Sequence, residues 1–314
     1  MPLDPRARRF LDTLAAMNPP RALALPVAER RAALAQLLSF FGAADEVAAV
    51  DQFELPGPEG TLAVRAYTPT GTQTSEPLPG MVYFHGGGLV AGTLDTHDPL
   101  CRALSNASGC RVLSVDYRLA PEHRFPAALA DGCAAIDWIA AQADELHVDR
   151  QRLGVSGDSA GATLAAVVCH TITAAGQVPL AFQFLLCPIM DFAAESDSRR
   201  SLAQGYLVDR DTLEHDLSHY LAADTDRADP RVSPLRVADV RHLPPTAVHT
   251  AEFDPLRDEG QAYAERLQRA GVRTLYRCHP GMIHLFYGMR GLITYAGAAF
   301  AQMGADIRSL LAPA

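Results

Sequence analysis

The sequence predicts an α/β fold in which helices cover a mostly parallel sheet, and two observations carry this prediction. From about residue 81 onward, short strand-like apolar runs alternate with segments of helical periodicity. Such alternation is typical of parallel strands that are joined by crossover helices. The 314 residues are 48% hydrophobic and 20% charged, which is an ordinary globular composition with enough apolar residues for a large buried core.

The elements follow in order along the chain. Apolar residues recur at helical spacing within 10–17 and 34–41, so the first 45 residues are predicted to be helical. Two β-like runs, 47–55 and 62–69, are separated by a turn rich in proline and glycine and are predicted to pair antiparallel. The parallel strands are predicted at residues 81–84, 111–116, 152–156, 182–186, 246–252 and 274–279.

A polar and partly helical insertion spans about residues 190–240. It is too long for an ordinary connection between a helix and a strand. We therefore expect it to form part of a lid. No internal repeat or low-complexity segment divides the chain, so one domain over residues 1–314 is expected.

Charge and cysteine content exclude several classes of protein. The chain has 27 Lys and Arg against 36 Asp and Glu, a net charge of −9, which disfavours binding to nucleic acid or to an anionic membrane. No apolar run reaches the roughly 18 residues of a membrane span. Asp12 and Thr13 interrupt the N-terminal apolar stretch before a signal peptide could form. The six cysteines form no C-x-x-C pair, so we expect a cytoplasmic protein with reduced thiols.

A lone serine lies between two glycines in the stretch Gly157-Asp158-Ser159-Ala160-Gly161. It follows a predicted strand and precedes a predicted helix, which is the context in which G-x-S-x-G forms a nucleophile elbow. A side chain at either glycine would crowd the neighbouring strand and helix. The N-terminus of the helix would also favour negative charge beside Ser159.

A serine hydroxyl becomes a good nucleophile only when a base takes its proton and an acid orients that base. In an elbow of this type the chain order is serine, acid, histidine. Asp254 follows the predicted strand 246–252, and the only histidines after Asp254 are His279 and His284. Because His279 ends a strand whereas His284 lies in a loop, we predict the triad Ser159, Asp254 and His284.

Two other carboxylates compete with Asp254 for the role of the acid. Glu252 is expected to lie within the strand, and Asp258 opens the next helix, where a carboxylate is typical of a capping charge.

Donors for the negative oxygen of a tetrahedral intermediate are also required. Residues 85–88 read His-Gly-Gly-Gly directly after a predicted strand, and glycine lets backbone N–H groups approach a ligand closely. We assign the N–H groups of Gly86, Gly87 and Ala160 to this oxyanion hole.

Five motifs in order resemble the bacterial hormone-sensitive-lipase family of esterases. They are HGGG at 85–88, YRLAPEHRFPA at 117–127, GDSAG at 157–161, DPLRDEG at 254–260 and the late His284. The resemblance implies an α/β-hydrolase with a mostly parallel eight-stranded sheet and a helical cap from about 1–45 and 190–240. It also implies a serine carboxylesterase for short to medium acyl esters that needs no cofactor or metal, and it suggests a homodimer.

The chain departs from this family at one position, since the residue after the catalytic histidine is usually glycine and here is Leu285. Leu89, Leu285 and Phe286 are expected to border the substrate pocket. A tighter pocket is therefore predicted, with side-chain packing of Leu285 in the core as the alternative.

Other readings of these residues are weaker. Gly86, Gly88 and Ala91 match a dinucleotide-binding spacing, but no helix is predicted to start directly at the glycines. His215 and His219 have a metal-ligand spacing, yet they lack the glutamate of H-E-x-x-H and a third ligand.

Plant gibberellin receptors resemble this esterase family but have lost the catalytic histidine, whereas His284 is present here. A non-catalytic ligand receptor is therefore disfavoured. Amidase or thioesterase activity stays open, because the same triad does not determine the leaving group.

Overall fold

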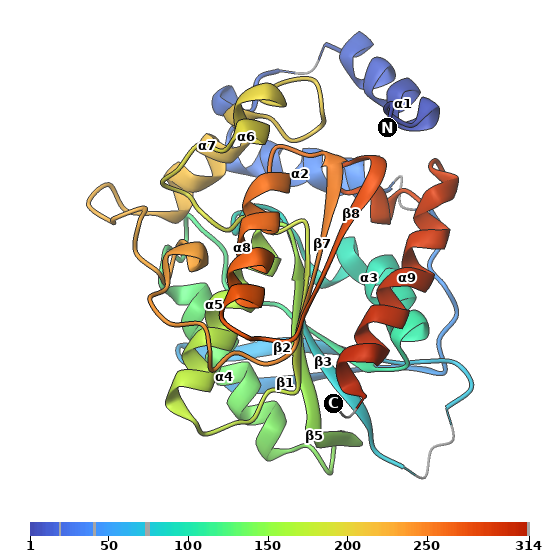
Figure 1. The fold of residues 1–314 in the computed structure, drawn as a ribbon, viewed down its shortest axis with the longest axis vertical. Helices are drawn as coiled ribbons and strands as arrows, with labels where there is room; N and C mark the ends of the chain where they lie inside the picture. Colours follow the sequence, from blue (N-terminus) through green and yellow to red (C-terminus); the bar gives the residue numbers. More distant parts are fainter. Residues whose placement is uncertain (19, 40–41, 73–75, 313–314) are drawn as a thin grey trace.

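The computed structural model describes residues 1–18, 20–39, 42–72 and 76–312. Within these residues, eight strands form one sheet in the order β1-β2-β4-β3-β5-β6-β7-β8 (Figure 1). Strand β2 is antiparallel to β1 and β4, and the other pairs are parallel. The predicted mostly parallel eight-stranded sheet is confirmed. The strands are β1 Ala49–Gly57, β2 Gly60–Thr68, β3 Leu78–Phe84, β4 Arg111–Val115, β5 Val148–Asp158, β6 Phe182–Leu186, β7 Thr246–Phe253 and β8 Thr274–Ile283.

The central parallel strands β3, β4 and β6 are buried over most of their length because both faces of the sheet are covered. In β3, Val82 and Phe84 pack into one core cluster, whereas Met81 and Tyr83 pack into the other, as the two-residue period of a strand requires. Helices α4, α5 and α8 cover one face, and α3 and α9 cover the opposite face (Figure 1). These helices are α3 Leu94–Ser108, α4 Ala127–Ala141, α5 Ala160–Ala175, α8 Arg257–Arg269 and α9 Thr294–Leu311.

The helices of the N-terminal segment are α1 Pro5–Ala16 and α2 Val27–Leu38, and those of the insertion are α6 Asp197–Ser201 and α7 Arg210–Tyr220. Helices α1 and α2 of the N-terminal segment and helices α6 and α7 of the insertion lie near each other at one end of the molecule (Figure 1). Residues from both segments line one cavity together with Ser159. Among the described residues, no helix combines the length and apolar composition that crossing a membrane requires.

Candidate active site

Ser159 occupies a sharp turn between the end of β5 and the start of α5. Its φ of 53° and ψ of −125° place it in a backbone region that costs about 1–3 kcal/mol for a residue with a side chain. A Cβ at Gly157 would lie 2.4 Å from the carbonyl oxygen of Gly161, and one at Gly161 would lie 2.2 Å from that of Phe84. Both glycines are therefore required for α5 to pack this closely against the sheet.

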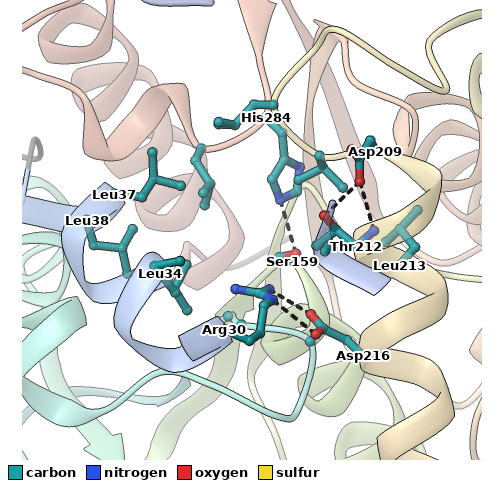
Figure 2. Close-up of a pocket in the computed structure, with 18 of the residues that line it drawn as sticks. Arg30, Leu34, Leu37, Leu38, Ser159, Asp209, Thr212, Leu213, Asp216 and His284 are labelled. Carbon is teal, nitrogen blue, oxygen red and sulfur yellow. Dashed lines mark hydrogen bonds and ion pairs between the residues drawn. The ribbon is translucent and has the colours of Figure 1, made fainter. Parts of the chain in front are cut away.

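The structure brings Ser159, His284 and Asp254 into one hydrogen-bonded chain. Oγ of Ser159 lies 3.1 Å from Nε2 of His284 (Figure 2), and Nδ1 of His284 lies 2.7 Å from Oδ2 of Asp254. The other carboxylate oxygen accepts the N–H of Leu256 at 2.9 Å. Because a carboxylate only accepts when ionised, Nδ1 carries a proton and Nε2 is left to accept the serine hydroxyl proton.

The competing side chains have other partners. Glu252 accepts the N–H of Gly281 at 2.7 Å, and Asp258 accepts the N–H of Ser198 at 2.7 Å. His279 lies with its Nε2 3.0 Å from Nδ1 of His249. None of the three is hydrogen-bonded to Ser159.

The predicted oxyanion hole needs one correction. The N–H of Gly86 donates to Oδ1 of Asp158 at 2.8 Å, so its single hydrogen is already committed. Within the described part of the chain, no acceptor takes the N–H of Gly87, Gly88 or Ala160. Gly88 therefore replaces Gly86 among the backbone donors that a ligand beside Ser159 could use.

Asp158 is the buried group that anchors this region, and sequence reasoning missed it. It accepts hydrogen bonds from the hydroxyls of Tyr83 and Tyr287 as well as from Gly86, and Nε2 of His97 lies 3.6 Å away. Burial alone would raise the pKa of Asp158, but His97 and these hydrogen bonds lower it to about 2. The signal in the sequence was the position of Asp158 directly before Ser159. A carboxylate that is buried there needs several hydrogen-bond donors around it.

The cavity above Ser159 has a volume of about 910 Å³. Figure 2 shows Leu34, Leu37 and Leu38 of α2 on one side and the charged residues Arg30 and Asp216 near Ser159. The cavity therefore combines an apolar wall from the N-terminal segment with a polar wall shared by α2 and α7.

Of the three predicted pocket residues, only Leu285 lines this cavity. Leu89 is buried in the core cluster that also contains Val90, and Phe286 is buried in the second cluster, where its ring packs against His279. These two assignments are corrected. Closeness in sequence to His284 or to the glycine turn did not predict which side chains face the cavity.

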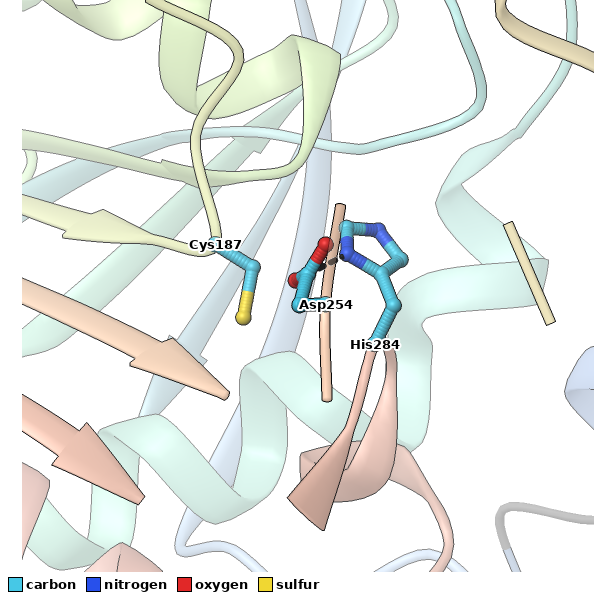
Figure 3. A group of neighbouring side chains, drawn as sticks. All are labelled: Cys187, Asp254 and His284. Atoms are coloured by element: carbon cyan, nitrogen blue, oxygen red, sulfur yellow. Dashed lines mark hydrogen bonds and ion pairs between the residues drawn. The ribbon is translucent and has the colours of Figure 1, made fainter. Parts of the chain in front are cut away.

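Cys187 lies beside Asp254 and His284 (Figure 3), and the ligand atoms of the three residues lie within 4.8 Å of one another. This is the one such group of potential metal ligands in the described residues. However, Asp254 and His284 are bonded to each other, and burial, followed by the charge of Asp254, raises the pKa of the Cys187 thiol well above its usual range. A protonated thiol can donate to the carboxylate but is a poor metal ligand.

The two alternative readings of the glycines and of the histidine pair do not match the structure. Helix α3 begins at Leu94, beyond the glycine turn, so no helix N-terminus faces a ligand at Gly86. Nδ1 of His215 lies 2.9 Å from Asp216, and its Nε2 lies 3.0 Å from the carbonyl oxygen of Leu25. Both nitrogens of His215 therefore face protein acceptors.

Comparisons with known proteins agree with the fold. A family model described as alpha/beta hydrolase fold matches residues 81–288. An ethyl acetate hydrolase from Pseudomonas putida is 38% identical over 257 residues, which are 81% of this chain and 81% of that protein. Carboxylesterase NlhH from Mycobacterium tuberculosis is 39% identical over 254 residues, 80% of this chain and 79% of that protein.

Solved structures give the same result. An ester-hydrolase from the metagenome of Lake Arreo, solved with a derivative of bipyridine phosphonate, matches with a TM-score of 0.94 at 41% identity and covers 98% of both chains. An esterase from Pyrobaculum calidifontis matches with a TM-score of 0.92 at 36% identity and covers 99% of both chains. The chain thus belongs to the alpha/beta hydrolases, among the hormone-sensitive-lipase-like esterases, as its motifs predicted.

Proposed function

We propose that this carboxylic ester hydrolase cleaves short to medium acyl esters, with Ser159 as the nucleophile, His284 as the base and Asp254 as the orienting acid. The continuous hydrogen-bonded chain from Ser159 to Asp254, at 3.1 and 2.7 Å, supports the proposal most directly. Names of relatives at 38–39% identity, an ethyl acetate hydrolase and a carboxylesterase, support the substrate class.

In the first step, Oγ of Ser159 attacks the ester carbonyl carbon while Nε2 of His284 takes the hydroxyl proton. The carbonyl oxygen becomes negative and accepts the N–H groups of Gly87, Gly88 and Ala160. The C–O bond then breaks, and the alcohol leaves with the proton from His284. Water, deprotonated by His284, attacks the acyl-serine and releases the carboxylic acid and the free Ser159.

The acyl chain is assigned to the apolar wall of the cavity. A volume of about 910 Å³ beside Leu34, Leu37 and Leu38 can hold a short or medium chain together with a small alcohol. Nothing in this chemistry requires a cofactor or a metal ion.

Replacing the nucleophile tests the proposal. Ser159→Ala is expected to lower kcat/KM for 4-nitrophenyl butyrate by about 10⁴-fold or more, because no acyl-enzyme can form. An organophosphate should add one adduct, at Ser159, in the native protein and none in the variant. Ser201→Ala, a change on the exposed end of α6, is the control and should keep native activity. An adduct on another residue would overturn the assignment.

Amidase and thioesterase activity share this acyl-transfer chemistry. An ester, a thioester and an anilide of butyric acid, assayed on the same preparation, rank the three reactions. We expect the ester to have the highest kcat/KM, and a higher value for the thioester or the anilide would reassign the reaction.

A further inference from the structure

Asp216 of α7 packs directly against the glycine turn that follows β3. A Cβ built on Gly88, whose φ is +70°, would lie 2.0 Å from Oδ2 and 2.5 Å from the Cβ of Asp216. The carboxylate therefore occupies the space that any side chain at position 88 would need. It contacts the turn at one of the residues whose N–H has no acceptor in the described chain.

Two side chains hold this carboxylate in place. Arg30 of α2 donates from Nε to Oδ1 at 3.1 Å and from Nη2 to Oδ2 at 2.7 Å, a bidentate pair (Figure 2). Nδ1 of His215 lies 2.9 Å from Oδ1. The side chains of Arg30 and Asp216 are 11% and 6% exposed, so the pair lies largely out of solvent and has a fixed geometry.

Helix α2 also contacts the turn independently of this pair. A Cβ on Gly87 would lie 3.0 Å from Cδ2 of Leu34, and Nε of Arg31 donates to the carbonyl oxygen of Val90 at 2.8 Å. The turn from Gly87 to Val90 is thus contacted both by α2 and by Asp216 of α7.

A carboxylate at this position creates an electrostatic problem for the reaction. The tetrahedral intermediate places a negative oxygen at the N–H groups of Gly87 and Gly88. An unpaired carboxylate packed on Gly88 would repel that charge in a cavity of low dielectric constant. The bidentate contact with Arg30 cancels the charge while leaving the packing in place.

We propose that Asp216 is a positioning residue for the turn from Gly87 to Val90, and that Arg30 is the cation that makes the negative charge of Asp216 compatible with catalysis. This inference rests on the proposed esterase function. It predicts different effects for loss of the cation and loss of the anion, which packing of α2 and α7 against the turn would not by itself produce. Loss of the cation alone should be worse than loss of the anion alone, and loss of both charges should restore most of the activity.

The test uses Asp216→Asn, Arg30→Gln, the double variant and Asp216→Ala. For each we measure kcat and KM on 4-nitrophenyl butyrate, the inhibition constant of an alkyl trifluoromethyl ketone, and the melting temperature. The ketone adds the serine oxygen to its carbonyl carbon and leaves an oxyanion, so it reports the same donors without turnover.

Arg30→Gln is expected to lower kcat by about 10- to 100-fold, approaching the loss of one oxyanion donor, with KM changed less than about threefold. Asp216→Asn should lose less than about fivefold, because the amide keeps the packing on Gly88. The double variant should recover at least half of the loss, on a logarithmic scale, that Arg30→Gln shows. Inhibition constants for the ketone should rise in proportion to the fall in kcat/KM.

Asp211→Asn is the matched control. Asp211 lies on the same helix and pairs with Arg21 of the N-terminal segment at 2.5 Å, but it does not contact the turn. Equal losses for Arg30→Gln, Asp216→Asn and this control, or single losses that multiply in the double variant, would overturn the proposal. If Asp216→Ala unfolds, the isosteric variants carry the test.

A different result is expected if the proposed esterase function itself is wrong. In that case the native protein itself would neither hydrolyse the ester nor bind the ketone. An active native enzyme whose Arg30→Gln and Asp216→Asn variants keep full activity would refute only the role of this ion pair.

Discussion

Two chains of hydrogen bonds involve β7 and β8 or the residues that directly follow them, and each leads from a hydroxyl through histidine to a carboxylate. In the first, Ser159, His284 and Asp254 are joined at 3.1 and 2.7 Å. In the second, the Tyr295 hydroxyl lies 3.1 Å from Nδ1 of His279, whose Nε2 lies 3.0 Å from Nδ1 of His249. Nε2 of His249 then lies 3.1 Å from Asp306.

The polarity of the two chains is the same, since in each a hydroxyl faces an imidazole that leads on to a carboxylate. The difference lies at the two ends. Ser159 and His284 line a cavity, whereas in the second chain Arg277 shares the carboxylate of Asp306 at 2.8 Å. A buried histidine–carboxylate pair is therefore a candidate for catalysis only when its hydroxyl opens onto space for a substrate.

The largest difference between the two hydrogen-bonded chains is expected when the carboxylate of each is replaced by its amide. Asp254→Asn is expected to lower kcat by about 10³- to 10⁴-fold, because the amide can hold His284 in the wrong tautomer. Asp306→Asn should leave kcat within about threefold of native but lower the melting temperature, because it leaves Arg277 without its partner. Similar losses of activity in both variants would show that the second chain also takes part in the reaction.

The second-largest effect is expected from acid, which should destabilise the second hydrogen-bonded chain. Burial, followed by the charges of His249 and Arg277, lowers the pKa of His279 to about 3. The unfolded chain, with an ordinary value of about 6.5, then binds more protons than the native state between those values. Stability is thus fully present above about pH 6.5 and is lost as the pH falls toward 3.

Unfolding by urea at pH 7, 5 and 4 checks this prediction. His279→Gln keeps a side-chain acceptor for Tyr295 and a donor for His249 but cannot titrate, so its stability should fall less between pH 7 and 4 than that of the native protein. The same pH dependence in both proteins would assign the acid sensitivity to other buried groups.

The smallest effect is expected at Leu285, which follows the base of the first chain and lines the cavity. Leu285→Gly should raise kcat/KM for a bulky-alcohol ester relative to 4-nitrophenyl butyrate by about 5- to 30-fold. This corresponds to about 1–2 kcal/mol, in the lower part of the range for a few methylenes in an apolar pocket. Leu285 has a φ of 61° and a ψ of 8°, the left-handed region that glycine adopts without strain. Relief of that strain should offset part of the lost burial.

Kinetics and thermal unfolding of the same preparation distinguish the two roles of Leu285. A changed substrate ratio with a melting temperature near the native value supports the pocket role. An unchanged ratio with a clearly lowered melting temperature would favour packing in the core.

Residues close in sequence determined much of the fold. The run 182–186 was predicted as a strand and is β6, Phe182–Leu186, because a short apolar run between turns has few other ways to be buried. The elbow could also be predicted, since the spacing of Gly157 and Gly161 reflects a close approach of helix and strand. The pairing of His284 with Asp254 followed from chain order and loop position.

Partners distant in sequence decided the remaining features. The commitment of the Gly86 N–H depends on Asp158, 72 residues away, and the bond between Arg30 and Asp216 spans 186 residues. Leu285 borders the cavity and also packs in the second core cluster, whereas Leu89 packs in the first cluster away from the cavity, and this difference depends on how the turns dock. By itself the sequence determined which segments are strands and which residues are candidates for the reaction, because those are local properties. Only the tertiary structure decided which backbone N–H groups stay open and which charges neutralise each other, because both depend on packing between distant segments.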